Sequence, residues 1–342
     1  MRAGRVLLGC LSVAVTVLAL AVGLLLVGGA GGSSSAYGAR RALLGAAGRP
    51  GFVDPRSFAY VDQVGVGARV ELRSPRTGRV VKLLATFGRE FTNNGLALSN
   101  DDREVYVTLI GRRNLRIEQL ATSAGKRTFV ADGWEPAVSP NGRLLSYIEG
   151  RATVVVRNLS SGVTHRINVA GLLGRSEALD ELAAAAWLGD GSEVVVMVTP
   201  IAVAVADRAG GAQADNKSSA SVIVVQVGAR GRPVEANRVE LPGVGDLFRI
   251  SGDQTTPRGL LAARLGRRTV VDRVDLIGGR AKVTRLLSLS EVVPMAFDPA
   301  GHNFLYVAGD LHPALWIARI TRGRLAGAHR LVRNADVGAV SW

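Results

Sequence analysis

Acidic and amide side chains recur along the chain, each a few residues before a short apolar stretch. Their oxygen atoms are the ligands that Ca²⁺ prefers, and a group of carboxylates also attracts a cationic peptide or side chain. Asp, Asn and Glu are equally common in ordinary loops, where they form turns. The candidates for a binding or metal site are Asn94, Glu135, Asp180, Glu181, Asp246, Glu291 and Asp336.

Other chemistry-bearing residues form no catalytic pattern in the sequence. Arg249 stands where related stretches have alanine, so it either projects into the channel and binds an anion, or the repeat is misaligned here, or it is an ordinary surface arginine. The four histidines have no metal-ligand spacing. The sequence contains no Gly-x-Ser-x-Gly elbow, no phosphate-binding loop and no dinucleotide fingerprint. We therefore expect no catalytic residues and no required cofactor, with Ca²⁺ as the one metal that the acidic residues suit.

The apolar stretches that follow these residues are copies of one repeat. Each copy begins with a short strand motif, continues through a polar turn into a second strand, and reaches a glycine-containing hairpin after a third. Five of the six motifs place alanine second, and Arg249 is the exception. The motifs are LALS (96–99), PAVS (136–139), AAWL (185–188), FRIS (248–251), MAFD (295–298) and GAVS (338–341).

The sixth copy is divided between the two ends of the repeat region. GAVS ends the chain, whereas RSFAYVD (56–62) and ARVELRSPRTG (68–78) supply second and third strands that lack a first. From residue 51 onward each copy has about 49 residues, the size of a four-stranded propeller blade. The sequence predicts an all-β, six-bladed β-propeller that closes when the last strand pairs with the first, and converging inner strands explain the alanines.

One copy also resembles a known family. EPAVSPNGRLLSYIEG (135–150) is similar to the WD40-like (PD40) repeat of TolB-type six-bladed propellers, with Asn141 in place of the usual aspartate. The resemblance implies an extracytoplasmic binding platform. TolB proteins carry a second α/β domain, for which this chain has no room.

Two segments depart from the repeat. Residues 171–185 lengthen the entry to the fourth blade, and we expect a short helix opened by Ser176. Residues 199–221 enlarge the connection between its second and third strands. Long loops on a rigid ring are common recognition sites, although an insertion without a role is the alternative.

The N-terminus contains a segment suited to a lipid bilayer. Residues 6–27 carry no charge, and as a helix these 22 residues would span about 33 Å. Arg2 and Arg5 precede the segment, which predicts a cytoplasmic N-terminus and a propeller outside the cytoplasm. We expect a single-pass anchor or signal sequence at 1–28, a linker at 29–51 and the propeller at 52–342. Secretion after signal cleavage is the alternative.

Composition limits the partners. The net charge is +14, which attracts anionic polymers and lipids, but no basic run is interleaved with aromatic residues, so nucleic acid is not the expected partner. Cys10, the single cysteine, lies in the apolar segment and leaves the remaining chain without a disulfide.

These features support two hypotheses of function. The first is a non-enzymatic, membrane-tethered platform or scaffold that binds an envelope protein, peptide or polymer. The alternative is a Ca²⁺-dependent lactonase-like or esterase-like hydrolase that uses an acidic channel mouth. A hydrolase requires several of the acidic candidates to converge on one point, whereas a platform does not.

Overall fold

The computed structural model describes the repeat region almost completely. The described residues are 57–64, 67–110, 114–123, 126–173, 180–189, 191–200, 220–244, 246–252, 258–265, 268–277, 280–290, 292–298, 302–308, 313–321, 324–333 and 337–342. The predicted anchor and linker lie outside them. Of the described helices, none is long and apolar enough to cross a bilayer.

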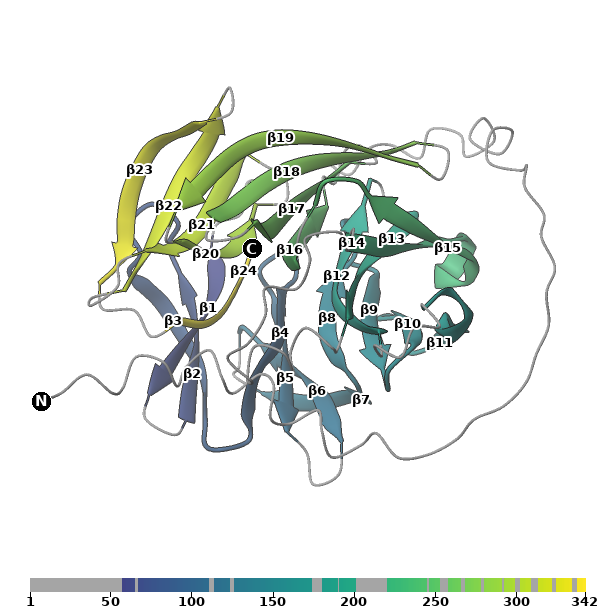
Figure 1. Cartoon of the computed structure of the whole chain (residues 1–342). Helices are drawn as coiled ribbons and strands as arrows, with labels where there is room; N and C mark the ends of the chain where they lie inside the picture. Colours follow the sequence, from purple (N-terminus) through teal and green to yellow (C-terminus); the bar gives the residue numbers. More distant parts are fainter. Residues whose placement is uncertain are drawn as a thin grey trace, which may run out of the picture.

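The described strands form six four-stranded antiparallel sheets, which we number as blades in chain order (Figure 1). Blade 1 contains β24 (Val337–Ser341), β1 (Phe58–Val64), β2 (Gly67–Arg73) and β3 (Val80–Phe87). Blade 2 contains β4 (Phe91–Leu98), β5 (Glu104–Ile110), β6 (Leu115–Ala121) and β7 (Arg127–Asp132). Blade 3 contains β8 (Trp134–Val138), β9 (Leu144–Glu149), β10 (Thr153–Asn158) and β11 (Thr164–Asn168).

The second half of the ring follows the same order. Blade 4 contains β12 (Asp180–Leu188), β13 (Glu193–Pro200), β14 (Ala220–Val227) and β15 (Pro233–Leu241). Blade 5 contains β16 (Asp246–Gly252), β17 (Arg258–Leu265), β18 (Arg268–Ile277) and β19 (Arg280–Ser290). Blade 6 contains β20 (Val292–Phe297), β21 (Asn303–Ala308), β22 (Ala314–Thr321) and β23 (Arg324–Val332). Two 3-10 turns, η3 (Ala170–Leu172) and η5 (Ala229–Gly231), lie between strands.

The ring closes by strand pairing between the two ends of the repeat region. Strand β24 is antiparallel to β1, and Tyr60 pairs with Val340. The rings of Phe58 and Trp342 lie 6.0 Å apart and extend the same contact. The predicted six-bladed propeller and its mode of closure are therefore confirmed.

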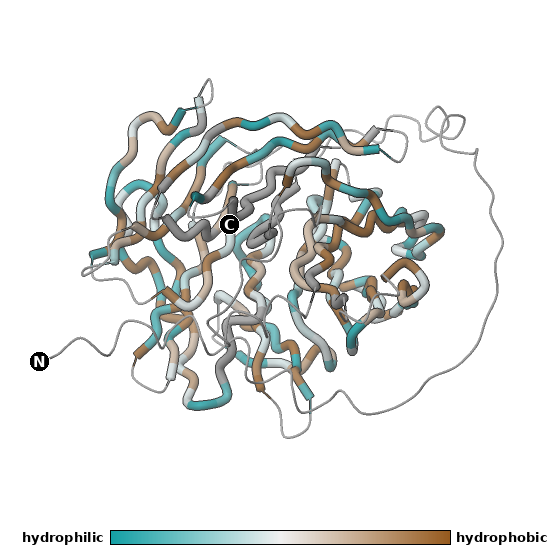
Figure 2. The backbone as a smooth tube through the Cα atoms, viewed as in Figure 1, coloured by the Kyte–Doolittle hydropathy of each residue, from teal (hydrophilic) through white to brown (hydrophobic). Residues whose placement is uncertain are grey.

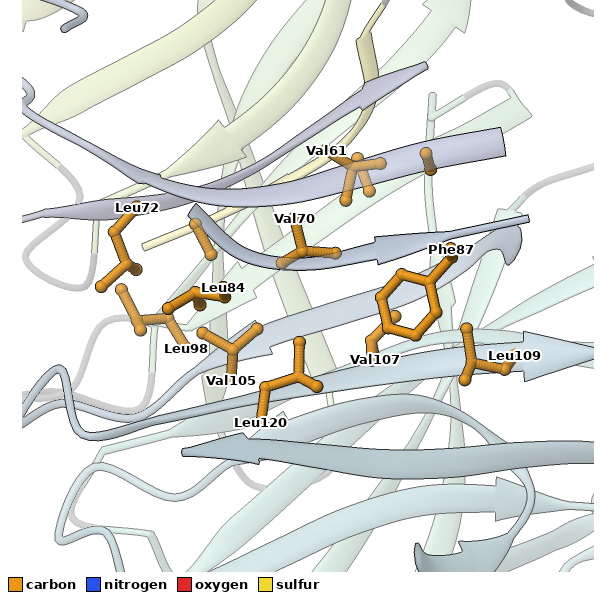
Figure 3. Close-up of a cluster of buried hydrophobic side chains, with 13 residues drawn as sticks. Val61, Val70, Leu72, Leu84, Phe87, Leu98, Val105, Val107, Leu109 and Leu120 are labelled. Carbon is orange, nitrogen blue, oxygen red and sulfur yellow. The ribbon is translucent and has the colours of Figure 1, made fainter. Parts of the chain in front are cut away.

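The hydrophobic core is divided among the six interfaces between neighbouring blades. Successive residues of a strand point to opposite faces of the blade, so that in β5 Val105 packs on blade 1 and Tyr106 packs on blade 3. Hydrophobic residues are accordingly spread along the strands (Figure 2). Figure 3 shows the interface of blades 1 and 2, where Val70 and Leu72 point toward Leu98 and Val105. Each blade is thus stabilised by two neighbours rather than by a core of its own.

The first strands of the blades form what we call the inner ring: β24, β4, β8, β12, β16 and β20, each in contact with the next. The residue after the motif alanine fills the space between blades in at least two copies, at Leu98 and Trp187. The alanines share this space: Ala339 packs in the same cluster as Leu98, and Ala137 packs beside Trp187. The predicted reason for alanine, clearance of the channel, is therefore incomplete, because alanine also admits the neighbouring blade's large side chain.

The predicted helix at the entry to blade 4 is wrong over the described part of the segment. Residues 180–185 belong to strand β12, and the described residues before it in this segment, 171–173, form the end of the 3-10 turn η3 and its C-cap. Leu182, Ala184 and Ala186 are buried on alternate positions, which is the period of a strand. Ser176 lies outside the described residues, as does the middle of the predicted insertion at 199–221, whose ends continue β13 and β14.

Candidate functional site

The strongest candidate site lies where the inner ring strands begin. Every inner ring strand has a β-bulge or similar irregularity in its pairing with the second strand of its blade, just before or within the repeat motif. Bulges concentrate at barrel rims and next to functional sites, because they re-aim side chains that a regular strand would bury. We call this end of the inner ring the mouth.

Glu135 is the candidate whose backbone is most unusual. It lies in the bulge of β8 between Trp134 and Ala137, and its φ of 50° places it in the left-handed region. A residue with a Cβ atom is disfavoured there, and such strain persists only where the surroundings impose it. Glu135 as a residue is half-buried, so the bulge places a partly exposed acidic residue where β8 begins, at the mouth.

Blade 2 holds this bulge in place. Gly95, with a φ of 111°, lies so close that an added Cβ would be 2.7 Å from the Glu135 Cα atom and 2.7 Å from the Pro136 Cδ atom. Only glycine permits both the backbone conformation and the approach. The bulges of β4 and β8 therefore form one rigid contact between two blades.

A buried hydroxyl adds an unusual polar group to the same interface. Thr108 of β5 is fully buried, and its Oγ1 atom has no hydrogen-bond partner. Its neighbour across the strands, Ile117, packs in the core between blades 2 and 3, so Thr108 faces blade 3. Buried polar groups without partners are uncommon in native proteins. Sequence analysis did not single out Thr108, and nothing in its sequence context distinguishes it from other strand threonines.

The remaining candidates occur in successive inner strands, but the described side chains do not define a metal-binding site among them. Asn94, Asp180, Glu181 and Asp246 were expected on the loops that enter the inner strands, and Arg249 within the strand motif itself. The structure places the four acidic and amide residues, like Glu135, within strands β4, β12, β16 and β8, because these strands begin earlier than the motif indicated, and it places Arg249 within β16 as expected. The structure describes the backbone but not the side chains of Asn94, Asp180, Glu181, Asp246 and Arg249. Glu291 and Asp336 lie outside the described residues.

Among the residues that the structure describes, no three His, Cys, Asp or Glu side chains are grouped to hold a metal ion. Three buried carboxylates are instead paired with arginines inside the blades. Glu71 contacts Arg73 at 2.7 Å, Glu118 contacts Arg127 at 2.8 Å, and Asp272 accepts two bonds from Arg285 at 2.7 and 3.2 Å. These ion pairs neutralise acids in the interior of the blades.

The serines of the repeat motif have a structural role that the sequence analysis did not assign. The Ser139 hydroxyl donates to the Asn141 Oδ1 atom at 2.8 Å and accepts from the Leu144 amide at 2.9 Å. Ser99 makes the equivalent bonds with Asp101 and the Glu104 amide. The common Ser-x-(Asn/Asp) spacing could have revealed this turn, in which the side chains replace missing backbone bonds.

Blade 6 makes the same turn with a carboxylate. The Asp298 Oδ1 atom accepts from the amides of His302 and Asn303 at 2.6 and 3.0 Å. Burial raises the pKa of Asp298 above its ordinary value, although these hydrogen bonds oppose the shift. Burial also raises the pKa of Tyr106, whose hydroxyl donates to Glu104 at 2.6 Å. Asp298 belongs to the turn after β20, and the Tyr106 hydroxyl reaches Glu104 beside the corresponding turn of blade 2.

Comparison with known proteins agrees with this architecture. No protein-family model and no curated protein sequence matches the chain. Among solved structures, TolB from Acinetobacter baumannii superposes with a TM-score of 0.58 and 17% identity, over 84% of this chain and 66% of that chain. The fold is that of a TolB-like six-bladed propeller.

Other TolB-like and unrelated chains superpose less well. A putative TolB from Agrobacterium tumefaciens has a TM-score of 0.50 and 14% identity, over 82% of this chain and 90% of its own. A chain of a nidogen/laminin complex has a TM-score of 0.53 and 12% identity, over 83% of this chain and 97% of its own. Identities this low establish a shared fold and carry no information about activity.

Proposed function

We propose that this protein is a non-enzymatic, extracytoplasmic β-propeller that binds an envelope protein, peptide or polymer at the mouth of its inner ring. The strained Glu135 in the β8 bulge is the observation on which this proposal depends. Strained backbone conformations concentrate at functional sites, where they hold a side chain in a geometry that relaxation would lose.

Rigidity supports a binding role for this site. Glu135 is held by the close approach of Gly95, and both residues belong to strands that are hydrogen-bonded within their own blades. A carboxylate that is already positioned loses little conformational entropy when it binds a cation or a basic side chain. A TolB-like fold is compatible with such a platform.

Attachment to the membrane is part of the proposal. The uncharged segment at residues 6–27 is long enough to cross a bilayer, and residues 28–56 would connect it to β1. Sequencing the N-terminus of the mature protein tests this part. An intact N-terminus with membrane fractionation supports an anchor, whereas a start beyond residue 28 supports secretion.

Site-specific photo-crosslinking of the full chain in its own cell envelope tests the binding site. One probe replaces Asp132, which is exposed and ends the strand that leads into β8. The matched probe replaces Phe129 in the same strand, 59% exposed but nearer the middle of the outer strand. We expect a discrete adduct at position 132 that is absent at 129 and is lost in the charge-removing variant Glu135→Gln.

Two outcomes contradict the proposal. Equal adducts from both probes, or an adduct that Glu135→Gln does not change, would show that the mouth is not the docking surface. Absence of any adduct combined with Ca²⁺-dependent hydrolysis of an ester or lactone by the purified full chain would instead support the hydrolase.

A further inference from the structure

The outer strands of blades 6 and 1 meet at a backbone contact. An added Cβ on Gly78, in the hairpin between β2 and β3, would be 2.0 Å from the Leu331 carbonyl oxygen of β23. Figure 1 shows β3 and β23 at the same edge of the ring. Residues on either side of Gly78 and Leu331 therefore form one continuous surface.

This surface carries several unneutralised positive charges. Arg76 and Arg79 flank Gly78, Arg330 and Arg333 flank Leu331, and all four are exposed. Residues 74–83 and 324–333 contain no acidic residue. Within the described part of the chain, none of the four arginines has an ion-pair partner.

Apolar side chains are exposed beside these arginines. Val80, Val81 and Leu83 of β3 are 47%, 60% and 52% exposed. Single exposed apolar residues are normal on a protein surface, but here three lie within four positions of one outer strand. We call the four arginines together with Val80, Val81 and Leu83 the blade 6–1 rim.

Glu71, an acidic residue of the neighbouring strand β2, does not reduce the charge of this rim. Glu71 of β2 is buried and bonded to Arg73, whose guanidinium also lies 4.5 Å from the Tyr60 ring centroid. Arg73 donates to the Gly78 carbonyl oxygen at 2.8 Å as well, which ties this pair to the hairpin. The Glu71–Arg73 pair is therefore neutral overall, whereas the blade 6–1 rim keeps its positive charge.

We propose that the blade 6–1 rim binds anionic phospholipid headgroups at the surface of a bilayer, with the three apolar side chains inserted shallowly among them. Exposed apolar residues bordered by arginines match the interfacial region of a membrane, where phosphates meet acyl chains. The inference rests on the proposed membrane tether, because that tether leads into β1 of blade 1 and would hold this rim beside the bilayer. The ring would then stand on its edge and leave its mouth accessible.

Hydrogen exchange of the full chain tests this surface. The protein is reconstituted in nanodiscs of phosphatidylcholine alone and of phosphatidylcholine with phosphatidylglycerol. An arginine near an anionic surface contributes roughly a fivefold factor to binding, so even two bound arginines exceed about tenfold. We therefore expect amide exchange at 76–83 and 328–333 to be at least about tenfold slower in the anionic discs. Exchange at 232–240, in the outer strand of blade 4 opposite, should be the same in both discs.

A matched pair of substitutions separates lipid binding from general effects. Val81 and Val234 are both 60% exposed on outer strands, and Arg79 and Arg232 are both exposed neighbours of these strands. R79Q/V81S should lose most of the lipid-dependent protection, whereas R232Q/V234S should retain it.

Each of the other possible results contradicts lipid binding by the blade 6–1 rim, and each points to a different explanation. A chain that enters nanodiscs without charge-dependent protection disproves rim binding but leaves the tether intact. A chain that does not enter nanodiscs disproves the tether and the rim together, while binding at the mouth stays open to the crosslinking experiment. Protection that follows protein concentration, or an added oligonucleotide, instead of lipid charge would assign the rim to a second copy or to nucleic acid.

Discussion

The inner ring and the outer rim of the propeller are built from the same repeat but differ in how they are held. The inner strands contact their neighbours around the whole ring and carry bulges, and β4, β8 and β20 end in turns closed by Ser99, Ser139 and Asp298. The outer strands bury fewer residues: in β23 only Leu331 is buried, and none of β11 is. Inner positions are therefore constrained by two blades at once, whereas outer positions are free to vary in charge and polarity.

This difference indicates a division of roles. Constraint at the inner ring maintains the fold and positions the mouth, and freedom at the rim permits surfaces such as the cationic edge of blades 6 and 1. Substitutions that compare matched inner and outer residues should therefore show large and small effects, respectively.

Loss of ring closure should have the largest effect. Val340 is 6% exposed and pairs with Tyr60, so V340D places an unpaired charge in the core between blades 6 and 1. We expect the free energy of unfolding to fall by more than about 4 kcal/mol, or cooperative folding to be lost. Urea unfolding followed by tryptophan fluorescence measures it. V234D on the outer strand β15 should change the free energy of unfolding by less than about 0.5 kcal/mol. Equal effects of the two variants would contradict ring closure by β24 and β1.

One outer position is an exception, because in blade 5 the Arg285 side chain of the outer strand β19 pairs with the buried Asp272 of β18. R285M leaves Asp272, which is fully buried, without its partner. We expect a loss of about 2–3 kcal/mol, below the usual range because Arg285 is itself 40% exposed. R166M, which removes the exposed pair with Glu149, should cost at most about 0.5 kcal/mol. If both variants unfold at the same urea concentration, the burial of Asp272 is not maintained in solution.

The contact between the β4 and β8 bulges should rank next. G95A must displace the backbone of Glu135 and adopt a left-handed φ, which we expect to cost about 2–3 kcal/mol. G142A also has a positive φ, but an added Cβ there meets nothing within 4 Å, so about 1 kcal/mol is expected. Differential scanning calorimetry of both variants measures the difference, and a G95A loss no greater than that of G142A would show that the bulges move apart.

The serine turn allows a close comparison of inner and outer hydroxyls. S139A removes a fully buried hydroxyl with two hydrogen bonds and should destabilise the protein by about 1–2 kcal/mol. S160A removes a similar bond to Asn158 on an exposed outer hairpin and should have an effect below about 0.5 kcal/mol. Chemical denaturation at neutral pH tests the pair; the opposite ranking would refute a structural role for the motif serine.

The smallest expected effect concerns the carboxylate in blade 6. Because burial raises the pKa of Asp298 in the folded protein, its contribution to stability is full below the ordinary value of 3.8 and is lost as pH rises through the folded pKa. D298S, which reproduces the turn of blades 2 and 3, should remove this dependence and gain stability relative to the parent between acidic and neutral pH. Denaturation midpoints over that range measure the change, and parallel curves for the two proteins would exclude it.

Sequence analysis predicted the architecture in detail because the information is local. Alternating residues, motif turns and the divided sixth copy each specify contacts within one blade, and the pairing of β24 with β1 follows from the missing first strand. The candidate site was predicted less well. Sequence reasoning selected Glu135 for its charge, but Gly95 and Thr108 were missed because their importance depends on the neighbouring blade.

The sequence alone determined that six four-stranded units are joined in a ring, since the period and turn chemistry of each unit can be read without knowing its neighbours. Only the tertiary structure decided that Glu135 adopts a left-handed backbone beside Gly95 and that two arginine pairs from opposite ends of the repeat region form one surface. The physical reason is that each of these features arises from contacts between segments far apart in the chain, and their geometry exists only after the blades have packed.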